Sequence, residues 1–382
     1  MMRHLFTSDT ARRALFVAGI LGFVALALCS DANVLTRFHI MKTAKAGDSL
    51  IGTQRKFHSS VGDEGAMPDL DGATGWLNSV PLSRKSLRGK IVLVDFWTYT
   101  CINSIRPLPY LRNWAAKYND AGFVVIGVHT PEFSFEHEPM NVETAVHNLN
   151  VTFPVAIDSK SRIWQSFNNQ AWPAQYLVDA KGRIRYHHFG EGDYGEIERI
   201  IQELLKENGA TRLTSETTSV SGVGIEAAPD WTEERSPETY IGYRQAQNFA
   251  SPEKVRKDSI QVFSSPAKPS LNHWGLSGSW NLNAESAVLQ AVPGKIVFRF
   301  HSRDLHLVLA PTKDGKPVRF KVTLDGAAPG ENYGVDTAPD GPGEIREPRL
   351  YQLIRQKGPI VDRTFEIEFL DPGVQALDFT FG

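Results

Sequence analysis

One junction in the sequence constrains the fold more than any other feature: an apolar run that passes directly into a cysteine-bearing segment. Residues 91–96 (IVLVDF) are apolar apart from one aspartate, and Cys101 follows within the stretch WTYTCINS. The pattern predicts a buried strand over 91–96 and a helix from about Cys101 to Tyr118, with Thr100 as its N-cap. A helix N-terminus stabilises an anion, so we expect the Cys101 sulfur to ionise readily and to act as a nucleophile.

A thiol–disulfide pair would need a second cysteine three residues further on, and Ser104 stands at that position. The Ser104 hydroxyl lies one helical turn along and can support the thiolate, but it cannot attack a mixed disulfide. The chain has only two cysteines, Cys29 and Cys101, which are too few for a disulfide scaffold or a thiolate metal site. We therefore expect a single-cysteine site that depends on an external thiol for release of its adduct.

The N-terminal segment predicts export. Several arginines precede an uncharged run over 14–30, which is short for a spanning helix of roughly 20 residues but suits a signal peptide or minimal membrane anchor. Cys29 at the end of the run leaves lipidation open as an alternative. Residues 31–66 are polar without periodicity and predict a tether. The expected location is extracytoplasmic, in the periplasm or cell envelope, with membrane contact through residues 1–30.

The remaining sequence predicts two domains. Alternating strand and helix patterns over 67–208 end in a hairpin and an amphipathic helix, which indicates an α/β domain with a mixed sheet covered on both faces. Residues 209–236 are rich in Thr, Ser, Gly and Glu and predict a linker. Short alternating runs separated by turn residues over 237–382 predict an all-β sandwich of jelly-roll type. The net charge of −2 offers no electrostatic footprint for nucleic acid.

A second element belongs with the cysteine segment. Pro173 follows Trp172 just before a predicted strand, where a proline is tolerated and can be cis. If the bond is cis, the backbone of Trp172 can pair with a substrate peptide. The residues expected to line a substrate groove are Trp97, Tyr99, Thr100, Trp172 and Pro173. The alternative for Trp97 and Tyr99 is that they only pack over the start of the helix.

These motifs resemble the thioredoxin superfamily, in its exported TlpA-like (redoxin) branch. More narrowly, "WTYTCINS", "GVHTPEF", "FNNQAWPAQYLVDAKGRIRYHHFGEGDY" and "FLDPGVQALDFTFG" resemble the soluble region of DipZ-type cytochrome c biogenesis proteins over roughly residues 66 to 382. The resemblance implies an α/β thioredoxin-like domain followed by a carbohydrate-binding-module-like sandwich. In that family the motif is CINC, a redox pair that receives electrons from a multi-helix membrane domain. Here Ser104 replaces the second cysteine, and no such membrane domain is expected within this sequence.

The second domain offers candidates for a sugar site. Aromatic rings stack on sugar faces, and Trp274, Arg303 and Tyr351 are the groups that can contribute. The alternative is a docking or solubilising module. No cofactor is expected. No metal is expected either, because His187 and His188 are adjacent strand residues that point to opposite faces.

Three functions remain open at this point. The leading hypothesis is an exported, membrane-tethered thiol–disulfide oxidoreductase or isomerase that uses Cys101 on protein or peptide thiols and disulfides, with release by a substrate thiol or a small external thiol. The alternative is a non-enzymatic envelope protein whose sandwich binds carbohydrate or a protein. A weaker alternative is a peroxiredoxin-like peroxidase: Thr98 lies three residues before the cysteine as such sites prefer, but Val94 stands where their pattern has a proline.

Overall fold

The structure of the protein is a computed structural model that describes residues 61–382. The predicted signal or anchor segment and nearly all of the predicted tether lie outside these residues. Within the described part of the chain, no helix is both long and apolar enough to cross a bilayer. The predicted domain boundaries at 67, 208 and 237 remain predictions, although the first sheet already includes Gly65 and Ala66.

The first domain is built on a mixed seven-stranded sheet in the order β1-β7-β6-β3-β4-β5-β2. Strands β3, β4 and β5 run parallel, and β6 and β7 are antiparallel additions on the other side of β3. The strands are β1 (Gly65–Ala66), β2 (Gly75–Leu77), β3 (Ile91–Trp97), β4 (Phe123–His129), β5 (Val155–Ile157), β6 (Ala174–Val178) and β7 (Arg183–Phe189). The expected mixed α/β sheet with a terminal hairpin is confirmed.

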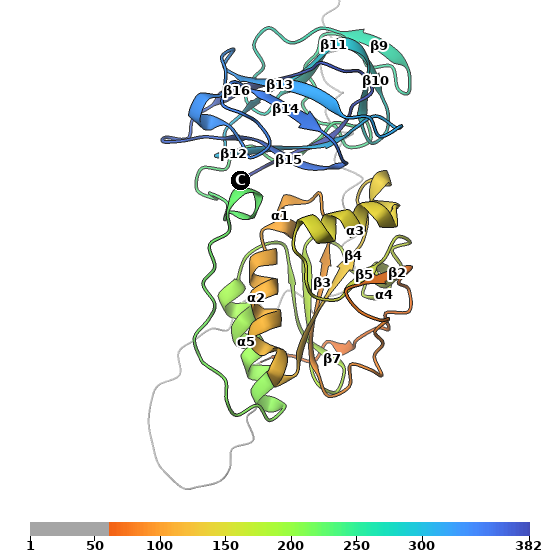
Figure 1. The fold of residues 1–382 in the computed structure, drawn as a ribbon, viewed down its shortest axis with the longest axis vertical. Coiled ribbons are helices and arrows are strands. Elements are labelled where there is room, and N and C mark those ends of the chain that lie inside the picture. The colour runs from red at the N-terminus through yellow and green to blue at the C-terminus, as the bar shows by residue number, and fades with distance from the viewer. Residues whose placement is uncertain (1–60) are drawn as a thin grey trace, which may run out of the picture. The chain divides into compact units, whose positions relative to one another are not determined.

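Strand β3 shows why the sheet is covered on both faces. All seven of its residues are buried, and successive side chains of a strand point to opposite faces. Ile91 and Leu93 pack in one apolar cluster with helices α2 and α5, while Val92 and Val94 pack in another with α4. The α-helices of this domain are α1 (Ile102–Ile105), α2 (Leu108–Tyr118), α3 (Pro139–Asn148), α4 (Arg162–Ser166) and α5 (Tyr194–Glu207), and Figure 1 shows α2 and α5 side by side.

The helix expected from about Cys101 to Tyr118 is two helices. Helix α1 ends with Arg106 as its C-cap, and α2 begins after Pro107. Proline has no amide hydrogen to donate to the preceding turn, so the helix breaks there and restarts with prolines in its first turn. The N-cap of α1 is Cys101 itself and not Thr100, and no side chain caps the helix.

The second domain is all-β, as expected, and its strands pair antiparallel with one another. Its strands are β8 (Thr239–Tyr240), β9 (Ile260–Phe263), β10 (Trp274–Leu282), β11 (Ala287–Phe300), β12 (Asp304–Ala310), β13 (Val318–Leu324), β14 (Pro342–Ile345), β15 (Arg349–Arg355), β16 (Arg363–Phe369) and β17 (Gln375–Phe381). The long β11 pairs with β10, β16 and β17, which links all ten strands into one hydrogen-bonded network. The domain is therefore a wrapped sheet, or half-barrel, in place of the two separate sheets expected of a jelly roll.

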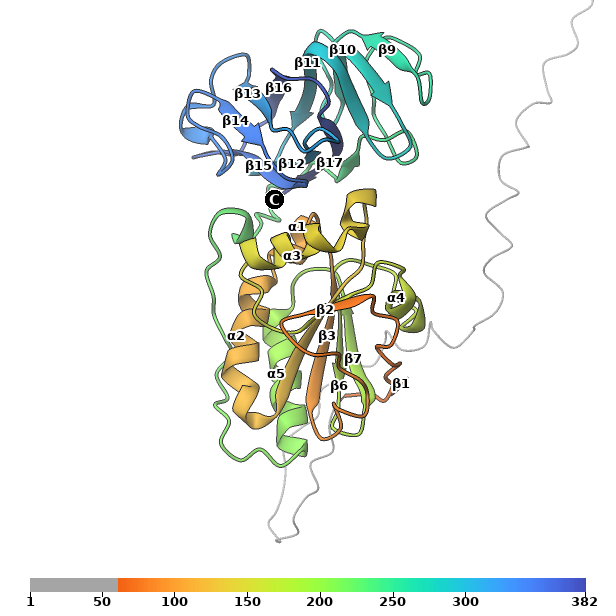
Figure 2. The same ribbon diagram turned by 45° about the vertical axis from the view of Figure 1, so that its right-hand side comes forward.

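Three strands of the half-barrel are buried on both faces because the first domain covers their outer side. Leu307 of β12 points into the core of the second domain, whereas its neighbour Val308 belongs to the apolar cluster of the first domain, together with Leu350 of β15 and Leu377 of β17. Figures 1 and 2 show β12 and β15 facing α1 and α3. The start of α1, where Cys101 lies, is therefore at the interface between the two domains.

Candidate active site beneath the C-terminal domain

Cys101 lies between the end of β3 and the start of α1, as the N-cap residue of that helix. Its carbonyl oxygen accepts the amide hydrogens of Ser104 and Ile105, at 3.0 and 3.1 Å. The antiparallel register pairs Phe96 of β3 with Ala174 of β6. The segment that leads to Cys101 and the Trp172–Pro173 bond, which is cis, therefore meet at the same end of the sheet. The sequence-predicted pairing of these two elements is present in the fold.

The environment of the thiol differs from the expectation. Cys101 is only 7% exposed, and burial raises the pKa of its thiol well above the ordinary range, with the nearby Glu132 and Glu238 adding to the increase. The helix that was expected to favour the thiolate has only four residues. Burial therefore disfavours the thiolate of Cys101 in this arrangement, and Glu238 of the second domain adds to the effect.

Ser104 lies next to the thiol, as the spacing predicts. Its hydroxyl and amide lower the pKa of Cys101, but their effect is smaller than that of burial. The side chain is fully buried, and its Oγ makes no well-formed hydrogen bond. A buried hydroxyl without a firm partner is free to donate to a sulfur that acquires charge. Ser104 is therefore placed to support a thiolate, although it does not create one here.

Acidic side chains from both domains lie near the thiol: Glu132 and Glu238 act on Cys101, and Asp378 interacts with these two carboxyls. Glu132 follows β4, whereas Glu238 and Asp378 come from the second domain. The Tyr240 hydroxyl donates a 2.5 Å hydrogen bond to Glu132 across the interface. Burial, reinforced by the neighbouring acids, raises the pKa of Glu132 to about 8 and that of Asp378 well above its ordinary value. The contact between the domains therefore contains carboxyl groups whose burial favours the protonated form.

A second buried carboxyl, Glu136, organises the segment before Cys101. It accepts hydrogen bonds from the hydroxyls of Thr98 and Thr100, at 2.5 and 2.6 Å, and from the amides of Glu132 and Phe133, at 2.6 and 2.9 Å. Thr100 is therefore occupied by Glu136, which explains why it does not cap α1. Thr98, the residue that suggested a peroxidase, is held in the same way.

Two predicted groove residues, Trp97 and Tyr99, are packed inside the domain. Trp97 is fully buried, and its ring meets His129 edge-on at 5.6 Å. Tyr99 is 3% exposed and stacks on the other side of His129 at 5.3 Å. Burial lowers the pKa of His129 to about 3, so the imidazole between these rings is neutral. Trp97 therefore fits the alternative that these rings only pack inside the domain, and Tyr99 fits it in part.

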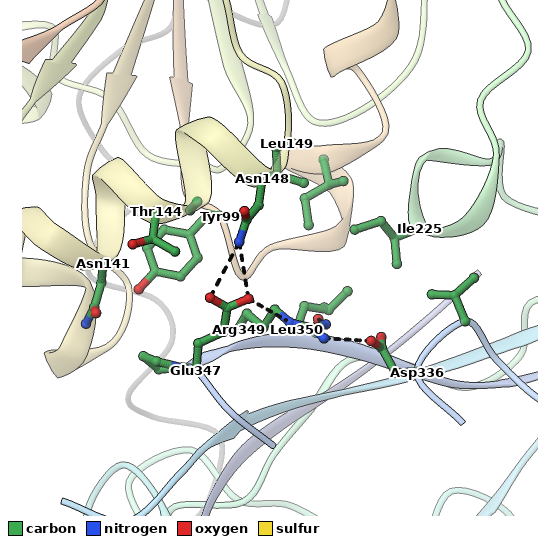
Figure 3. A pocket seen from close by; sticks show the side chains of 14 residues that line it. Tyr99, Asn141, Thr144, Asn148, Leu149, Ile225, Asp336, Glu347, Arg349 and Leu350 are labelled. Carbon is green, nitrogen blue, oxygen red and sulfur yellow. Dashed lines mark hydrogen bonds and ion pairs between the residues drawn. The ribbon is translucent and has the colours of Figure 1, made fainter. Parts of the chain in front are cut away.

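Tyr99 also lines a cavity of about 320 Å³ between the domains. Figure 3 shows Tyr99 and residues of α3 on one side and Glu347, Arg349 and Asp336 of the second domain on the other. Asn148 donates to Glu347 across it at 3.2 Å, and Arg349 pairs with Asp336 at 2.6 Å. The Tyr99 hydroxyl is buried without a hydrogen-bond partner. This cavity, on the same interface as the thiol, was not predicted, because its two walls are far apart in the sequence.

The cis-proline segment is partly accessible. Pro173 is buried and Trp172 is half-buried. The Trp172 indole donates to the carbonyl of Thr130 at 3.1 Å and packs against Trp164 at 4.3 Å. These contacts fix the segment beside the end of β4. Of the five predicted groove residues, Trp172 alone keeps appreciable exposure.

Beneath the site lies a buried carboxyl in the middle of the sheet. Asp95 of β3 accepts a hydrogen bond from Gln175 at 3.1 Å, while its second oxygen has no partner. Burial raises the pKa of Asp95 to about 8. An aspartate within a strand whose two faces are both covered was visible in the sequence, and it was the one signal there for a buried ionisable group.

The sugar-site candidates are not brought together on a surface. Trp274 and Tyr351 are fully buried, with Trp274 donating to the carbonyl of Gln247 and Tyr351 to that of Glu347. Arg303 pairs with Asp304 at 2.6 Å. The wrapped sheet turns both rings into its core, so neither offers a face for stacking, and we do not carry the sugar interpretation of these residues further.

The sequence offered no indication of Tyr240 and Asp378 in the second domain, or of the buried Arg106. Arg106 is 3% exposed; it pairs with Glu191 at 3.2 Å and donates to the carbonyl of Phe381 at 2.9 Å. No local pattern marks Glu132, Tyr240 or Asp378. The nearest signal was the RPLP segment after Ser104, which places a charged residue in a helix start that is otherwise apolar.

Comparison with known proteins agrees with this architecture. Residues 64–187 match the AhpC/TSA family model, and residues 236–382 match the model described as a thioredoxin-like C-terminal domain. Protein DipZ of Mycobacterium tuberculosis is 36% identical over 271 residues, which cover 68% of this chain and 38% of that protein. The thiol-disulfide oxidoreductase YkuV of Bacillus subtilis is 26% identical over 141 residues, or 37% of this chain and 95% of that protein.

The thiol-disulfide oxidoreductase ResA of Bacillus cereus is 26% identical over 128 residues, or 34% of this chain and 71% of that protein. The chain spans less than half the length of the DipZ proteins it matches. Each of the two similarities to thiol-disulfide oxidoreductases covers about a third of this chain. Two parts of the chain thus match these two domain models, and the chain is similar to the DipZ proteins over 68% of its length.

Proposed function

We propose that this protein is a thiol–disulfide oxidoreductase or isomerase that uses Cys101 as its single nucleophile. The observation that carries the proposal is the position of the cysteine at the junction of β3 and α1, with the Trp172–Pro173 segment at the same end of the sheet. The similarity of this domain to thiol-disulfide oxidoreductases supports the same chemistry. Its partners are protein or peptide thiols and disulfides.

The proposed reaction begins with the Cys101 thiolate attacking one sulfur of a substrate disulfide. A Cys101–substrate disulfide forms, and the other substrate sulfur leaves as a thiolate. Because Ser104 cannot displace the substrate, a second thiolate must attack the mixed disulfide. If that thiolate belongs to the substrate, the bond is rearranged without net oxidation. If it is a small external thiol, two successive attacks reduce the substrate disulfide and oxidise two molecules of the small thiol.

Capture of the mixed disulfide tests the proposal. The full chain is incubated with a peptide that contains a disulfide, across pH 6 to 9, and the Cys101 adduct is quantified by peptide mass spectrometry, which separates it from any adduct of Cys29. Cys101→Ser is the control. We expect an adduct that accumulates and is released by added thiol. Absence of an adduct at every pH, while denatured protein forms one, would refute the proposal.

We also propose that the protein acts outside the cytoplasm and is tethered by its N-terminal segment. The support is the charge and hydropathy pattern of residues 1–30. Fractionation of cells that express the full chain, with protease added from outside, tests this. Protection of the protein in the soluble cytoplasmic fraction would contradict it.

A second candidate function is a non-enzymatic binding protein. The observation that favours it is the burial of Cys101, which keeps the sulfur protonated and covered. The two functions differ in the capture experiment above, because a binding protein whose cysteine stays covered forms no adduct. Addition of hydrogen peroxide, followed by detection of a Cys101 sulfenic acid, tests the weaker peroxidase alternative in the same samples.

A further inference from the structure

The contact between the two domains blocks the proposed chemistry as it stands. Cys101 is 7% exposed. Its neighbour Ile102 shares an apolar cluster with Val308 and Leu350 of the second domain, so that domain packs against the start of α1. A disulfide of a protein substrate cannot approach a sulfur at this depth. The thiol-exchange function therefore requires the second domain to move away from the start of α1.

The contact between the two domains contains hydrogen bonds as well as an apolar part. Hydrogen bonds cross it from Tyr240 to Glu132, from Ser134 to Glu285 at 3.1 Å and from Arg106 to Phe381 at 2.9 Å. The apolar part is contributed from the second domain by a few side chains, Val308, Leu350 and Leu377. Interfaces between domains that are this polar permit relative motion.

Unpartnered polar atoms gather on both sides of the contact. The hydroxyl of Tyr99 on the first domain is buried without a hydrogen bond, as are Oδ1 of Asp378 and the hydroxyl of Thr380 on β17. Asp378 and Thr380 alternate with Phe379 and Phe381, whose rings are in the half-barrel core, so they face outward. A buried polar atom without a partner costs roughly 1–3 kcal/mol. Separation of the domains restores water to these atoms and offsets part of the apolar contact that is lost.

We propose that the second domain is an autoinhibitory cover, which closes over Cys101 through the Tyr240–Glu132 contact and opens to expose the thiol. The proposal rests on the proposed function, since it concerns access to the same sulfur. It assigns the second domain a regulatory role at this site.

Charge makes the cover sensitive to pH. Glu136, Glu238 and Glu285 act on Glu132, while Glu238 and Glu132 act on Asp378. The cations and imidazoles nearby are otherwise engaged: Arg106 pairs with the buried Glu191, and burial lowers the pKa of His306 on β12 to about 3. In the closed form, burial keeps the pKa values of Glu132 and Asp378 raised, so these carboxyls hold their protons. When the domains separate, water reaches the carboxyls, their pKa values fall and they release the protons. Closure is therefore strongest at low pH and weakens as the pH rises from the ordinary carboxyl range towards about 8.

The alkylation rate of Cys101 by iodoacetamide measures opening directly. The full-length protein is used, and peptide mass spectrometry resolves Cys101 from Cys29. Tyr240→Phe removes the hydroxyl that bonds Glu132. Tyr243→Phe is the matched control, because the Tyr243 hydroxyl donates to Asp258 at 2.8 Å on the exposed surface of the same domain. Glu132→Gln removes the ionisable group and keeps the acceptor for Tyr240.

We expect wild-type Cys101 to react at least tenfold more slowly than in the urea-unfolded protein. Tyr240→Phe is expected to accelerate the reaction about tenfold, which corresponds to about 1.4 kcal/mol, and Tyr243→Phe to leave it unchanged. Between pH 6 and 7.5 an uncovered thiol gains about tenfold in rate per pH unit, because only its own proton is lost. The covered thiol should gain more than that, and Glu132→Gln should bring the gain closer to tenfold, with Asp378 left to titrate.

Three outcomes would each overturn the proposal that the second domain covers Cys101. They are a wild-type alkylation rate equal to that of the unfolded protein, equal alkylation rates for the two tyrosine variants, or a wild-type rate that rises only tenfold per pH unit. If Tyr240→Phe fails to fold, as judged by circular dichroism, the pH profiles of the wild type and Glu132→Gln still decide. Alkylation reports opening whether or not Cys101 exchanges disulfides. A covered and opening thiol that forms no mixed disulfide therefore refutes the proposed function and leaves the cover standing.

Discussion

Arg106 and Phe381 are 275 residues apart in the chain and are joined by a 2.9 Å hydrogen bond from the guanidinium to the backbone carbonyl. The same guanidinium pairs with Glu191, and both side chains are almost fully buried. Arg106 ends the short helix that begins at Cys101, and Phe381 ends the last strand of the half-barrel. The Arg106 side chain thus links α1 to the segment after β7, through Glu191, and to β17 of the second domain, through Phe381.

Removal of this arginine is expected to destabilise the protein strongly. Arg106→Met leaves Glu191 buried without its partner, which costs about 3 kcal/mol or more. Urea denaturation measures the change in the free energy of unfolding. The double variant Arg106→Met/Glu191→Gln should cost less than the sum of the two single variants, because the second change removes the stranded charge. Additive costs would show that the two side chains do not depend on each other.

Restoring the second thiol is expected to restore an internal redox pair. Ser104→Cys places a thiol one turn along from Cys101, a separation at which a disulfide can close. The reduced variant should reduce one test disulfide per protein while its internal disulfide forms, and it should turn over when a reductant such as dithiothreitol regenerates the dithiol; the wild type should instead stop at the mixed disulfide until an external thiol releases it. Asn103→Cys is the control, since it adds a thiol on a different side of α1. A Ser104→Cys protein that never forms the internal bond would show that the start of α1 has another geometry.

The buried aspartate in the sheet predicts a pH-dependent stability. The pKa of Asp95 is raised to about 8 in the folded protein and is about 3.9 when unfolded. The folded state therefore binds the extra proton, and the stability that this proton contributes is lost as the pH rises between these values. Asp95→Asn should remove up to about 1.4 kcal/mol per pH unit of this slope.

Urea denaturation at several pH values between 5 and 8 measures this slope, and Asp120→Asn, at an exposed carboxyl, serves as the control. An unchanged slope in Asp95→Asn would place the titration elsewhere, for example at Glu132.

The segment between the domains is pinned to the first domain by Arg112. Its guanidinium makes two 2.8 Å hydrogen bonds to Glu226 in the short helical turn η3 (Gly224–Glu226). Both side chains are about one-fifth exposed, so Glu226→Gln should cost only about 1 kcal/mol. Limited proteolysis should cut residues 209–236 faster in this variant than in Glu216→Gln, which changes an exposed carboxyl in the same segment. Equal cleavage rates would mean that the ion pair does not hold the segment.

The parts of the fold that local pattern specifies were predictable. The strand over 91–96, the break in composition after residue 208 and the short strands beyond 237 follow from periodicity and turn residues, which act over a few positions. The split of the cysteine helix was less well predicted, although its cause, Pro107, was visible. The topology of the second domain was beyond reach of the sequence, because nothing local shows that β11 bends to pair with three other strands.

The sequence by itself determined that a cysteine stands between a buried strand and a helix, with a serine in place of a second thiol, since both are facts of adjacent residues. Tertiary structure alone decided the state of that cysteine. Glu132, Tyr240 and Asp378 come together over it only when the half-barrel packs on the first domain. The energy of a buried sulfur depends on the water and charge around it, and those are set by residues up to 277 positions away.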